Sequence, residues 1–372
     1  MIRYMKIGEI CDILNGYAFK SSRYISNKGI RVIRITNVQK GYIEDAEPKF
    51  YPEKEINEIK KFMLEDGDLL ISLTGNVGRV ALIDKSMLPA ALNQRVGCIR
   101  VNKKDLIYKP YLYHLLNSDY FEKQCINSSN GIAQKNMSTE WLKEYHIPVY
   151  SMDYQKKIAT IFDKIDIVIK KHYKQIEILD KIAKSLFIEM FGNLGEDIFG
   201  GGLKFLKDVC QINPKKDNYI ANIKDFLVSF VPMSAVSESG EIDTTIIKCY
   251  DEVKKGFTSF IEDDVLFAKI TPCMENGKGA IAKKLKNSVG FGSTEFHVLR
   301  PLKDKSNSAW IYYLTSFSHF RKEAEIKMTG SAGQRRVPAS FLENYKIALP
   351  PLELQNKFAN FVRGTDKSKL AV

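Results

Sequence analysis

The sequence contains one pattern twice, and this internal repeat constrains the fold more than any other feature. Residues 7–13, IGEICDI, are similar to residues 206–212, LKDVCQI, and residues 64–72, LEDGDLLIS, are similar to residues 260–268, FIEDDVLFA. Seven identities then share one shift of 200 positions: Gln134, Leu142, Tyr145, Ile147, Gln155, Ala159 and Asp166 return as Gln334, Leu342, Tyr345, Ile347, Gln355, Ala359 and Asp366. Because all matches keep the same order, we interpret the chain as two tandem copies of one unit.

Each copy consists of an irregular body followed by a helix. Short runs rich in β-branched and aromatic residues predict strands at 31–36, 68–75, 79–83, 95–101, 264–270, 279–284 and 295–301. Residues 111–125 and 310–328 predict a helix late in each body. Strands and a few helices in one body predict an α+β fold. The expected boundaries are a first body at 1–150, a long helix at 151–192, a Gly-rich linker at 193–203, a second body at 204–350 and a second helix at 351–372.

The stretch from Met152 to Gly192 predicts one long helix, because it contains no Pro and no Gly before Gly192. Its apolar residues follow a heptad pattern, which is typical of a helix that packs along a partner helix. At about 1.5 Å per residue the helix would be a rod of roughly 60 Å. A long helix inside an ordinary helical core is the alternative. The residues expected to pack on a partner are Ile158, Ile161, Ile165, Val168, His172, Leu179, Ile182 and Leu186.

The composition indicates a folded protein with an anionic partner. The chain has 56 Lys and Arg against 44 Asp and Glu, a formal net charge of +12. Nucleic acid is the usual partner of such a charge, although an A/T-rich genome also enriches a protein in Lys. No apolar run reaches the length of a membrane span, and the first residues show no signal peptide, so we expect a cytoplasmic protein. The six cysteines lack metal-binding or disulfide spacing and are expected to be reduced thiols.

Catalytic motifs are absent from the sequence. It contains no phosphate-binding G-x-x-x-x-G-K-[ST], no G-x-G-x-x-G after a strand and no N-P-P-[YF] tetrapeptide. The five histidines show no metal spacing, so no metal site is expected. Paired carboxylates at Asp66/Asp68 and Asp263/Asp264 precede strands in both copies, where capping of turns explains them better than catalysis. We therefore expect no enzymatic activity from the chain itself.

Gly-punctuated loops in both bodies carry residues that bind DNA. Arg and Lys contact phosphates and guanine, Asn and Gln contact adenine, and Gly allows close backbone approach. Each loop by itself is better explained as an ordinary surface loop, but the loops recur at matched places. The candidates are Ser72, Thr74, Asn76, Arg79, Asn93, Gln94, Arg95, Gln134, Lys135 and Asn136 in the first body, and Lys269, Thr271, Asn276, Lys278, Ser293, Thr294, Gln334, Arg335 and Arg336 in the second.

These features together resemble the specificity subunit of type I restriction-modification systems, over nearly the whole chain. The pattern that carries the resemblance runs from Gln134 through Leu142 to Ile147-Pro148 and Gln155, and again from Gln334 through Leu342 to Leu349-Pro350-Pro351 and Gln355. The segments LKDVCQI and DVLFAKI are similar to the opening and middle strands of that family. The resemblance implies that the two bodies are target-recognition domains and that the two helices pair as an antiparallel coiled coil.

The resemblance also implies a function and partners. Each recognition domain would read half of a bipartite site in double-stranded DNA, without catalysis of its own. Modification subunits, two in number, would bind around the helices and methylate adenine N6 with S-adenosylmethionine. Restriction subunits that translocate DNA with ATP and magnesium would join for cleavage. No cofactor is expected on this chain itself.

One departure from the family pattern concerns the second helix. A full second copy would extend about twenty residues beyond Val372. The second helix is therefore expected to cover the C-terminal half of the long helix, near Leu179, Ile182 and Leu186. The half with Ile158, Ile161, Ile165 and Val168 is expected to be an exposed apolar stripe that is covered by a modification subunit, by the same stripe of a second copy or by a helix that is not part of this sequence.

Two other functions remain open at this point. A coiled-coil scaffold whose bodies bind proteins would explain the long helix, although the loop composition and the net charge of +12 argue against it. A DNA-binding module of a fused restriction-methylation enzyme would explain the loops, although it would require the missing catalytic motifs.

Overall fold

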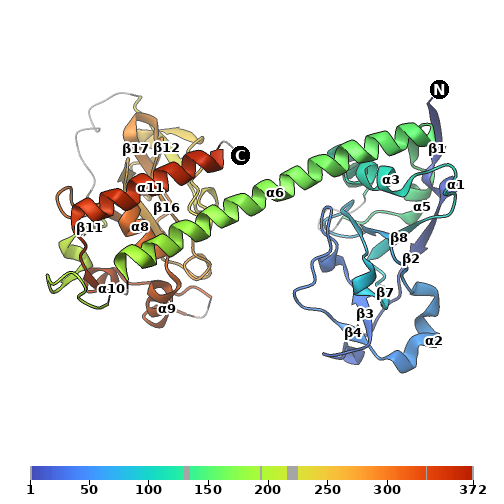
Figure 1. Cartoon of the computed structure of the whole chain (residues 1–372), viewed down its shortest axis with the longest axis horizontal. Helices are drawn as coiled ribbons and strands as arrows, with labels where there is room; N and C mark the ends of the chain where they lie inside the picture. Colours follow the sequence, from blue (N-terminus) through green and yellow to red (C-terminus); the bar gives the residue numbers. More distant parts are fainter. Residues whose placement is uncertain (1, 130–134, 193–194, 216–224, 332, 371–372) are drawn as a thin grey trace. The chain divides into compact units, whose positions relative to one another are not determined.

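The computed structural model describes residues 2–129, 135–192, 195–215, 225–331 and 333–370 (Figure 1). The chain forms two compact units, Met1–Lys170 and Lys171–Val372, which we call unit 1 and unit 2. The boundary between them falls inside the long helix α6, Met152–Phe191. Among the described residues, no helix combines the length and apolar composition needed to cross a membrane.

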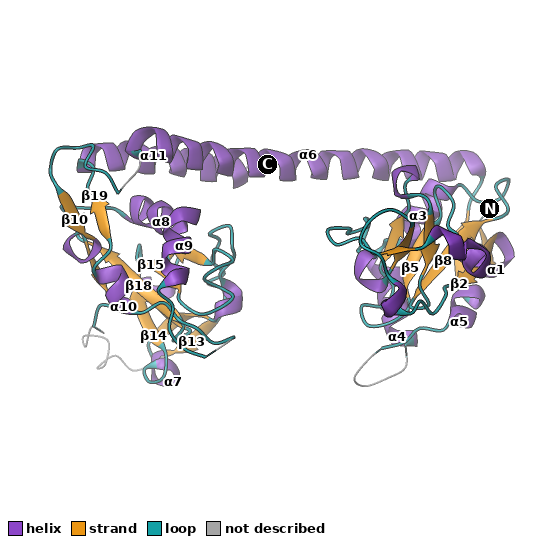
Figure 2. Cartoon of the chain, turned by 90° about the horizontal axis from the view of Figure 1, so that it is seen from below, coloured by secondary structure: helices purple, strands orange, loops and turns teal. Residues whose placement is uncertain are grey.

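Unit 1 contains a four-stranded sheet and a three-stranded sheet that share a hydrophobic core, together with several helices, which are purple in Figure 2. The larger sheet has the order β2-β8-β5-β6, formed by Cys11–Asn15, Val96–Val101, Leu69–Ser72 and Val80–Leu82, and all its pairs are antiparallel. The second sheet has the order β4-β3-β7, formed by Phe50–Tyr51, Ile30–Ile33 and Ala90–Leu92, with β3 and β7 parallel. Short helices α1, Ile7–Ile10, and α2, Ile56–Ile59, lie between strands.

Unit 2 repeats this plan. Its first sheet has the order β11-β18-β15-β16, formed by Cys210–Ile212, Phe296–Pro301, Val265–Ala268 and Gly279–Ile281. Its second sheet has the order β13-β12-β17-β14, formed by Ile247–Cys249, Leu227–Val231, Val289–Gly292 and Thr258–Ile261, with β12 and β17 parallel. Helix α7 spans Tyr250–Val253. All seven strand runs expected from the sequence form strands, and the duplicated α+β fold is confirmed.

The central strands are buried on both faces, which explains their uninterrupted apolar sequences. In β5, Leu69 and Ile71 face the core shared with the helices, whereas Leu70 faces the core between the two sheets. In β15, Val265 and Phe267 face the helices, and Leu266 and Ala268 face the second sheet. The period-2 alternation of a strand divides each unit into the same two cores.

The helices expected at 111–125 and 310–328 are each interrupted once. Unit 1 has α3, Lys109–Leu116, and α4, Asp119–Ser128, and unit 2 has α8, Ser308–Ser316, and α9, Ser318–Ile326. The Ser118 side chain accepts a hydrogen bond from the Phe121 backbone N–H at 3.2 Å and so begins a new helix. Further helices, α5, Thr139–Glu144, and α10, Ala339–Glu343, precede the end of each body.

A two-stranded sheet joins the start of each body to its end. Strand β1, Arg3–Lys6, pairs antiparallel with β9, His146–Val149, and β10, Leu203–Phe205, pairs antiparallel with β19, Lys346–Ala348. The helices α6 and α11, Leu352–Leu370, begin directly after β9 and β19. The repeated residues Ile147 and Ile347 are buried in these strands.

The repeated glutamines anchor each helix to its body. Gln155 accepts a hydrogen bond from the Tyr108 N–H at 2.8 Å and donates to the carbonyls of Leu106 and Tyr150 at 2.9 and 2.8 Å. Gln355 repeats the arrangement with Asn307, Lys305 and Pro350 at 3.2, 2.9 and 2.9 Å. Both side chains are fully buried. Their recurrence in the sequence therefore reflects a structural role.

One carboxylate of each pair, Asp68 and Asp264, has a structural role, as the sequence indicated. Asp68 accepts from the Glu65 backbone N–H at 2.8 Å and binds Arg100 through two hydrogen bonds of 2.9 and 2.6 Å. Asp264 accepts from the Ile261 N–H at 2.8 Å and binds Arg300 through two hydrogen bonds of 2.8 Å. Each aspartate caps the turn before a central strand, and its charge is compensated by an arginine from the neighbouring strand.

In unit 2, α11 lies antiparallel to the C-terminal half of α6. The ring centroids of Phe358 lie 5.2 Å from Phe187 and 5.5 Å from Phe191, and the Lys369 ammonium bonds the Asp180 carboxylate at 2.5 Å. The antiparallel pairing is confirmed, but the expected heptad positions are partly wrong. The buried residues are Ala183, Phe187 and Phe191, while Leu179 and Leu186 are half-buried and Ile182 is exposed.

The cause of this shift is a third helix. The Phe187 ring also lies 5.9 Å from Tyr313 on α8 and 5.0 Å from Phe317. Because α6 packs against α8 as well as α11, its buried face is defined by aromatic residues four positions apart. A two-helix coiled coil would instead bury positions three and four apart.

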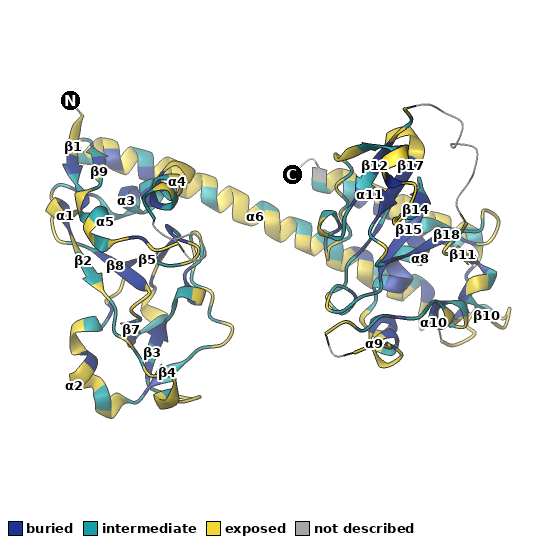
Figure 3. Cartoon of the chain, turned by 180° about the vertical axis from the view of Figure 1, so that it is seen from behind, coloured by how far each residue is buried: buried dark blue, intermediate teal, exposed yellow. Residues whose placement is uncertain are grey.

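The middle of α6 is largely exposed, as its yellow colour in Figure 3 shows, and its exposed residues include an apolar stripe. Ile161, Ile165 and Val168 are 58%, 45% and 50% exposed, as expected. Ile158 is an exception, because it packs against the core of unit 1. His172 is half-buried.

Candidate nucleic-acid interface

Three loops of unit 1 meet beside the N-terminal end of β8. We call the described residues 72–79, 93–95 and 135–136 rim 1. The Leu73 N–H donates to the Arg95 carbonyl at 3.0 Å, the Gly75 N–H donates to the Lys135 carbonyl at 2.9 Å, and the Met137 N–H donates to the Leu73 carbonyl at 2.8 Å. The backbone itself therefore brings together the three loops selected from the sequence.

The matching loops of unit 2 meet in the same way, and we call residues 269–279, 292–295 and 333–336 rim 2. The Lys269 N–H donates to the Glu295 carbonyl at 2.9 Å, the Thr271 N–H to the Arg335 carbonyl at 3.0 Å, and the Val337 N–H to the Lys269 carbonyl at 2.9 Å. Each of the three backbone hydrogen bonds given for rim 1 has a counterpart in rim 2. The two rims therefore have the same backbone framework but carry different side chains.

Rim 1 combines a rigid base with an exposed polar edge. Ser72 is buried and its hydroxyl accepts a hydrogen bond from the Arg79 backbone N–H at 3.0 Å, so it shapes the loop. Arg79 donates to the Gln39 side chain. Gly78 has φ of +86°, and a Cβ there would lie 2.7 Å from that of Cys125, so only glycine fits. The exposed or half-exposed candidates are Thr74, Asn76, Asn93, Gln94, Arg95, Lys135 and Asn136, whereas Gln134 lies outside the described residues.

Rim 2 contains more ion pairs than rim 1 among the described residues. Arg336 binds Glu295 through three hydrogen bonds of 2.9 to 3.2 Å, and its Nη1 donates to the Gln334 carbonyl at 3.0 Å. Arg335 lies 3.6 Å from Glu275 and 3.8 Å from Glu325. Lys278 donates to the Met233 carbonyl at 3.4 Å. Asn276, Thr294 and Gln334 are exposed, and Lys269, Thr271 and Ser293 are half-buried.

The sequence reasoning missed the acidic partners of rim 2. The hydrogen bonds from Arg336 hold the pKa of Glu295 below its ordinary value, so this carboxylate is charged at neutral pH. Thr271 donates to Glu275 at 2.7 Å. The candidates were cationic, amide and hydroxyl residues, so the carboxylates Glu275 and Glu295 were not among them. However, the shift of 200 that aligns Glu295 with Arg95 could have identified it.

His297 clamps the base of rim 2. Its Nε2 lies 2.8 Å from the Val337 carbonyl oxygen, and its Nδ1 lies 3.0 Å from the Asn213 amide nitrogen, which fits a neutral ring protonated on Nε2. Burial lowers the pKa of His297. The equivalent position in β8 is Gly97, because Gly97 pairs with Ile71 as His297 pairs with Phe267. Rim 1 therefore lacks this clamp.

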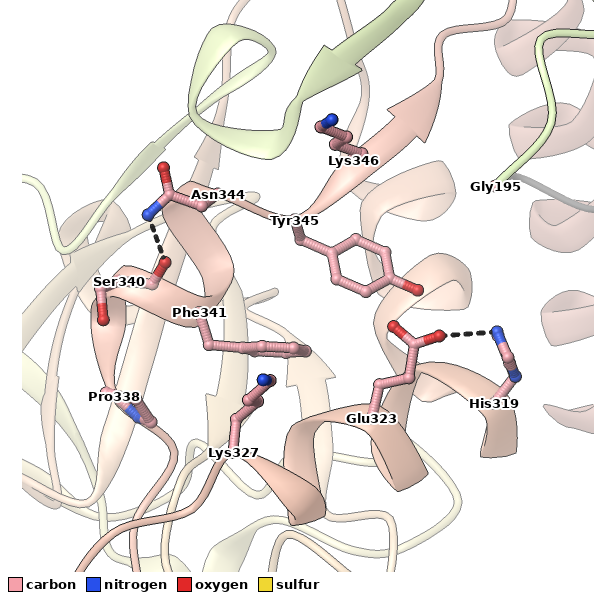
Figure 4. Close-up of a pocket in the computed structure, with 10 residues that line it drawn as sticks. All are labelled: Gly195, His319, Glu323, Lys327, Pro338, Ser340, Phe341, Asn344, Tyr345 and Lys346. Atoms are coloured by element: carbon pink, nitrogen blue, oxygen red, sulfur yellow. Dashed lines mark hydrogen bonds and ion pairs between the residues drawn. The ribbon is translucent and has the colours of Figure 1, made fainter.

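A separate pocket of about 520 Å³ lies in unit 2 beside α9 and α10 (Figure 4). Its wall includes Phe341, Tyr345 and the pair His319–Glu323, whose Nε2 and Oε1 atoms are 2.8 Å apart. Burial and Glu323 raise the pKa of Tyr345, so its phenol stays protonated at neutral pH. Within the described ranges, no group of three or more His, Cys, Asp or Glu side chains is arranged to hold a metal ion.

Two α+β units with matched sheets, matched helix anchors and matched polar rims define a tandem-repeat protein. The chain belongs to the type I restriction modification DNA specificity domain family, whose model matches residues 2–179 and again residues 202–371. The family resemblance found in the sequence is thereby confirmed.

Relatives and solved structures agree with this assignment. The chain is 45% identical over 148 residues to the type I restriction enzyme EcoEI specificity subunit of Escherichia coli, a match that covers 39% of this chain but 24% of the relative. It is 24% identical over 388 residues to the putative type I restriction enzyme MjaX specificity subunit of Methanocaldococcus jannaschii, covering 97% and 86% of the two chains. The crystal structure of a type I restriction-modification S subunit from M. genitalium matches with a TM-score of 0.53 at 14% identity, over 99% of this chain and 90% of that chain, and supports the fold.

Proposed function

We propose that this chain recognises a bipartite site in double-stranded DNA, with rim 1 reading one half-site and rim 2 the other, as the specificity subunit of a type I restriction-modification complex. The observation that carries the proposal is the pair of equivalent rims. A shared framework with different exposed side chains is what two readers of different sequences require. The family assignment and the net charge of +12 support it.

The salt dependence of binding tests the proposed DNA contacts. Lys and Arg residues that neutralise phosphates release counterions, so the affinity should fall steeply as salt rises. Binding of the full chain to duplex DNA should be measured from low to physiological salt, in the presence of its partner subunits. A coiled-coil scaffold, the alternative function favoured by the exposed stripe of α6, would show no such dependence on DNA or salt.

Catalysis would be supplied by partners in this account. Modification subunits, two per complex, would transfer methyl groups from S-adenosylmethionine to adenine N6, and restriction subunits would use ATP and magnesium. The purified chain alone should therefore neither methylate nor cut DNA. Methyl transfer by the purified chain would overturn this division of labour. We place the complex in the cytoplasm, where the six free thiols of the chain would stay reduced.

The exposed stripe of α6 is the proposed docking surface for a modification subunit or for a second copy of the chain. Exposed apolar patches of this kind mark interaction sites. Replacing Ile161 and Ile165 by Lys should abolish the association while leaving the folded units intact, because both side chains are about half exposed. Sizing of the chain across a concentration series, with and without the partner, measures this. A variant that assembles as the native chain does would exclude the stripe as an interface.

A further inference from the structure

The turns that precede β8 and β18 are closed by the same two kinds of hydrogen bond. In rim 1, the Arg95 N–H donates to the Asn93 side-chain oxygen at 3.3 Å and the Val96 N–H donates to the Asn93 carbonyl at 2.9 Å. In rim 2, the Glu295 N–H donates to the Ser293 hydroxyl at 3.2 Å and the Phe296 N–H donates to the Ser293 carbonyl at 3.2 Å. The Arg95 and Glu295 side chains therefore leave equivalent points of the two frameworks.

The two side chains carry opposite charge. Arg95 is exposed, and within the part of the chain that the structure describes its guanidinium has no hydrogen-bonding partner. Glu295 is 24% exposed and is held in one orientation by Arg336. Arg336 and Lys269 lie close enough to favour its charged form. Their positive charge also offsets the repulsion that an isolated carboxylate would meet beside DNA phosphates.

The opposite charges select opposite base edges. A guanidinium matches the two acceptors of guanine, O6 and N7, whereas a carboxylate accepts a hydrogen bond from the N4 amino group of cytosine. A carboxylate has about four lone-pair sites, so Glu295 can bind Arg336 and still accept from a base. Facing the acceptor edge of guanine, it would be repelled, which adds discrimination against the wrong base.

Resting on the proposed function, we propose that this turn position determines specificity in both units: Arg95 demands a guanine in the half-site of rim 1, and Glu295 demands a cytosine in the half-site of rim 2. Arg336 is a positioning residue that orients and neutralises Glu295. The two rims thus read a G·C pair in opposite orientations with one backbone framework.

The test is a competition among duplexes with randomised positions, followed by sequencing of the duplexes bound by the full chain with its partner subunits. Arg95→Gln should reduce the preference for guanine at one position of one half-site by about 10-fold to 100-fold. Glu295→Gln should relax one cytosine in the other half-site, and Arg336→Lys should weaken the same preference. The matched control is Glu353→Gln, the same chemical change at an exposed site on α11, which should leave the motif unchanged.

The outcomes separate this inference from the function on which it rests. If the native chain selects no sequence, the proposed function fails. If the native chain selects a bipartite motif that Arg95→Gln and Glu295→Gln leave unchanged, or weaken uniformly at every position, the function stands and the specificity role is overturned. Because Arg95 is exposed, its variant should fold even if Glu295→Gln destabilises unit 2.

Discussion

Rim 1 and rim 2 share a backbone framework but not their side chains. Both are closed by the same backbone hydrogen bonds, yet unit 2 adds the Glu295–Arg336 pair and the His297 clamp where unit 1 has Arg95, Asn136 and Gly97. The shared part comprises buried residues with fixed partners, such as Gln155 and Gln355. The comparison teaches that the backbone hydrogen bonds are shared, whereas side chains at matched positions differ both at the surface, as Arg95 and Glu295 do, and in the interior, as Gly97 and His297 do.

The largest expected effect concerns the two halves of α6. Phe187→Ala should destabilise unit 2 by about 3–5 kcal/mol, because it leaves a cavity among Tyr313, Phe317 and Phe358. Ile165→Ala should cost less than about 0.5 kcal/mol, since that side chain is already exposed in the chain alone. Denaturant unfolding measures both. Equal losses would mean that the stripe is buried in solution.

The ion pairs Asp68–Arg100 and Asp264–Arg300 should contribute equally to the unfolding free energy of the two units. Arg100→Ala and Arg300→Ala each leave an almost fully buried carboxylate, Asp68 or Asp264, without its cation. Each should therefore cost about 3–5 kcal/mol of unfolding free energy. The chain has two tryptophans, Trp141 in unit 1 and Trp310 in unit 2, so single-tryptophan variants report each unit separately. A large loss in one unit alone would break the equivalence of the frameworks.

The glutamine anchors provide a smaller test of the same equivalence. Gln155→Ala and Gln355→Ala each remove the buried side chain that pairs one backbone N–H and two backbone carbonyls, at a cost of about 1–3 kcal/mol. Gln175→Ala, on the exposed face of α6, is the control and should stay within about 0.5 kcal/mol. Unfolding curves that do not separate Gln155→Ala from Gln175→Ala would exclude the anchoring role.

The smallest expected effect is a pH dependence of the unfolding free energy that occurs in unit 2 and not in unit 1. Burial lowers the pKa of His297 in the folded state, so the unfolded chain binds a proton first as pH falls below about 6.5. Unit 2 should then lose up to about 1.4 kcal/mol per pH unit, until the pH reaches the lower folded pKa. Unit 1 has Gly97 there and lacks this contribution. The Trp310 signal measured at pH 7.5 and 5.5 tests the slope, which His297→Gln should remove.

The sequence predicted the repeat, the strands and the loops that form the rims. These features follow from short runs of apolar and β-branched residues and from identical residues that recur 200 positions later. It placed Ile182 in a helix interface wrongly, since the buried face of α6 depends on α8, a helix more than a hundred positions away in the sequence. It missed Glu295 because its role arises from a contact with Arg336, and no local pattern encodes such a pairing. Ser72 was selected by residue type, although burial gives it a structural role.

The most direct test of the account is the recognition motif of a chain carrying Arg335→Ala. Arg335 is 39% exposed in rim 2, and its ion pairs of 3.6 and 3.8 Å are long enough to be exchanged for DNA. The methylated motif of host DNA, read by single-molecule sequencing, should lose information in one half-site alone, with a loss of affinity of about 1–3 kcal/mol. Equal relaxation of both half-sites would contradict the division of the chain into two independent readers.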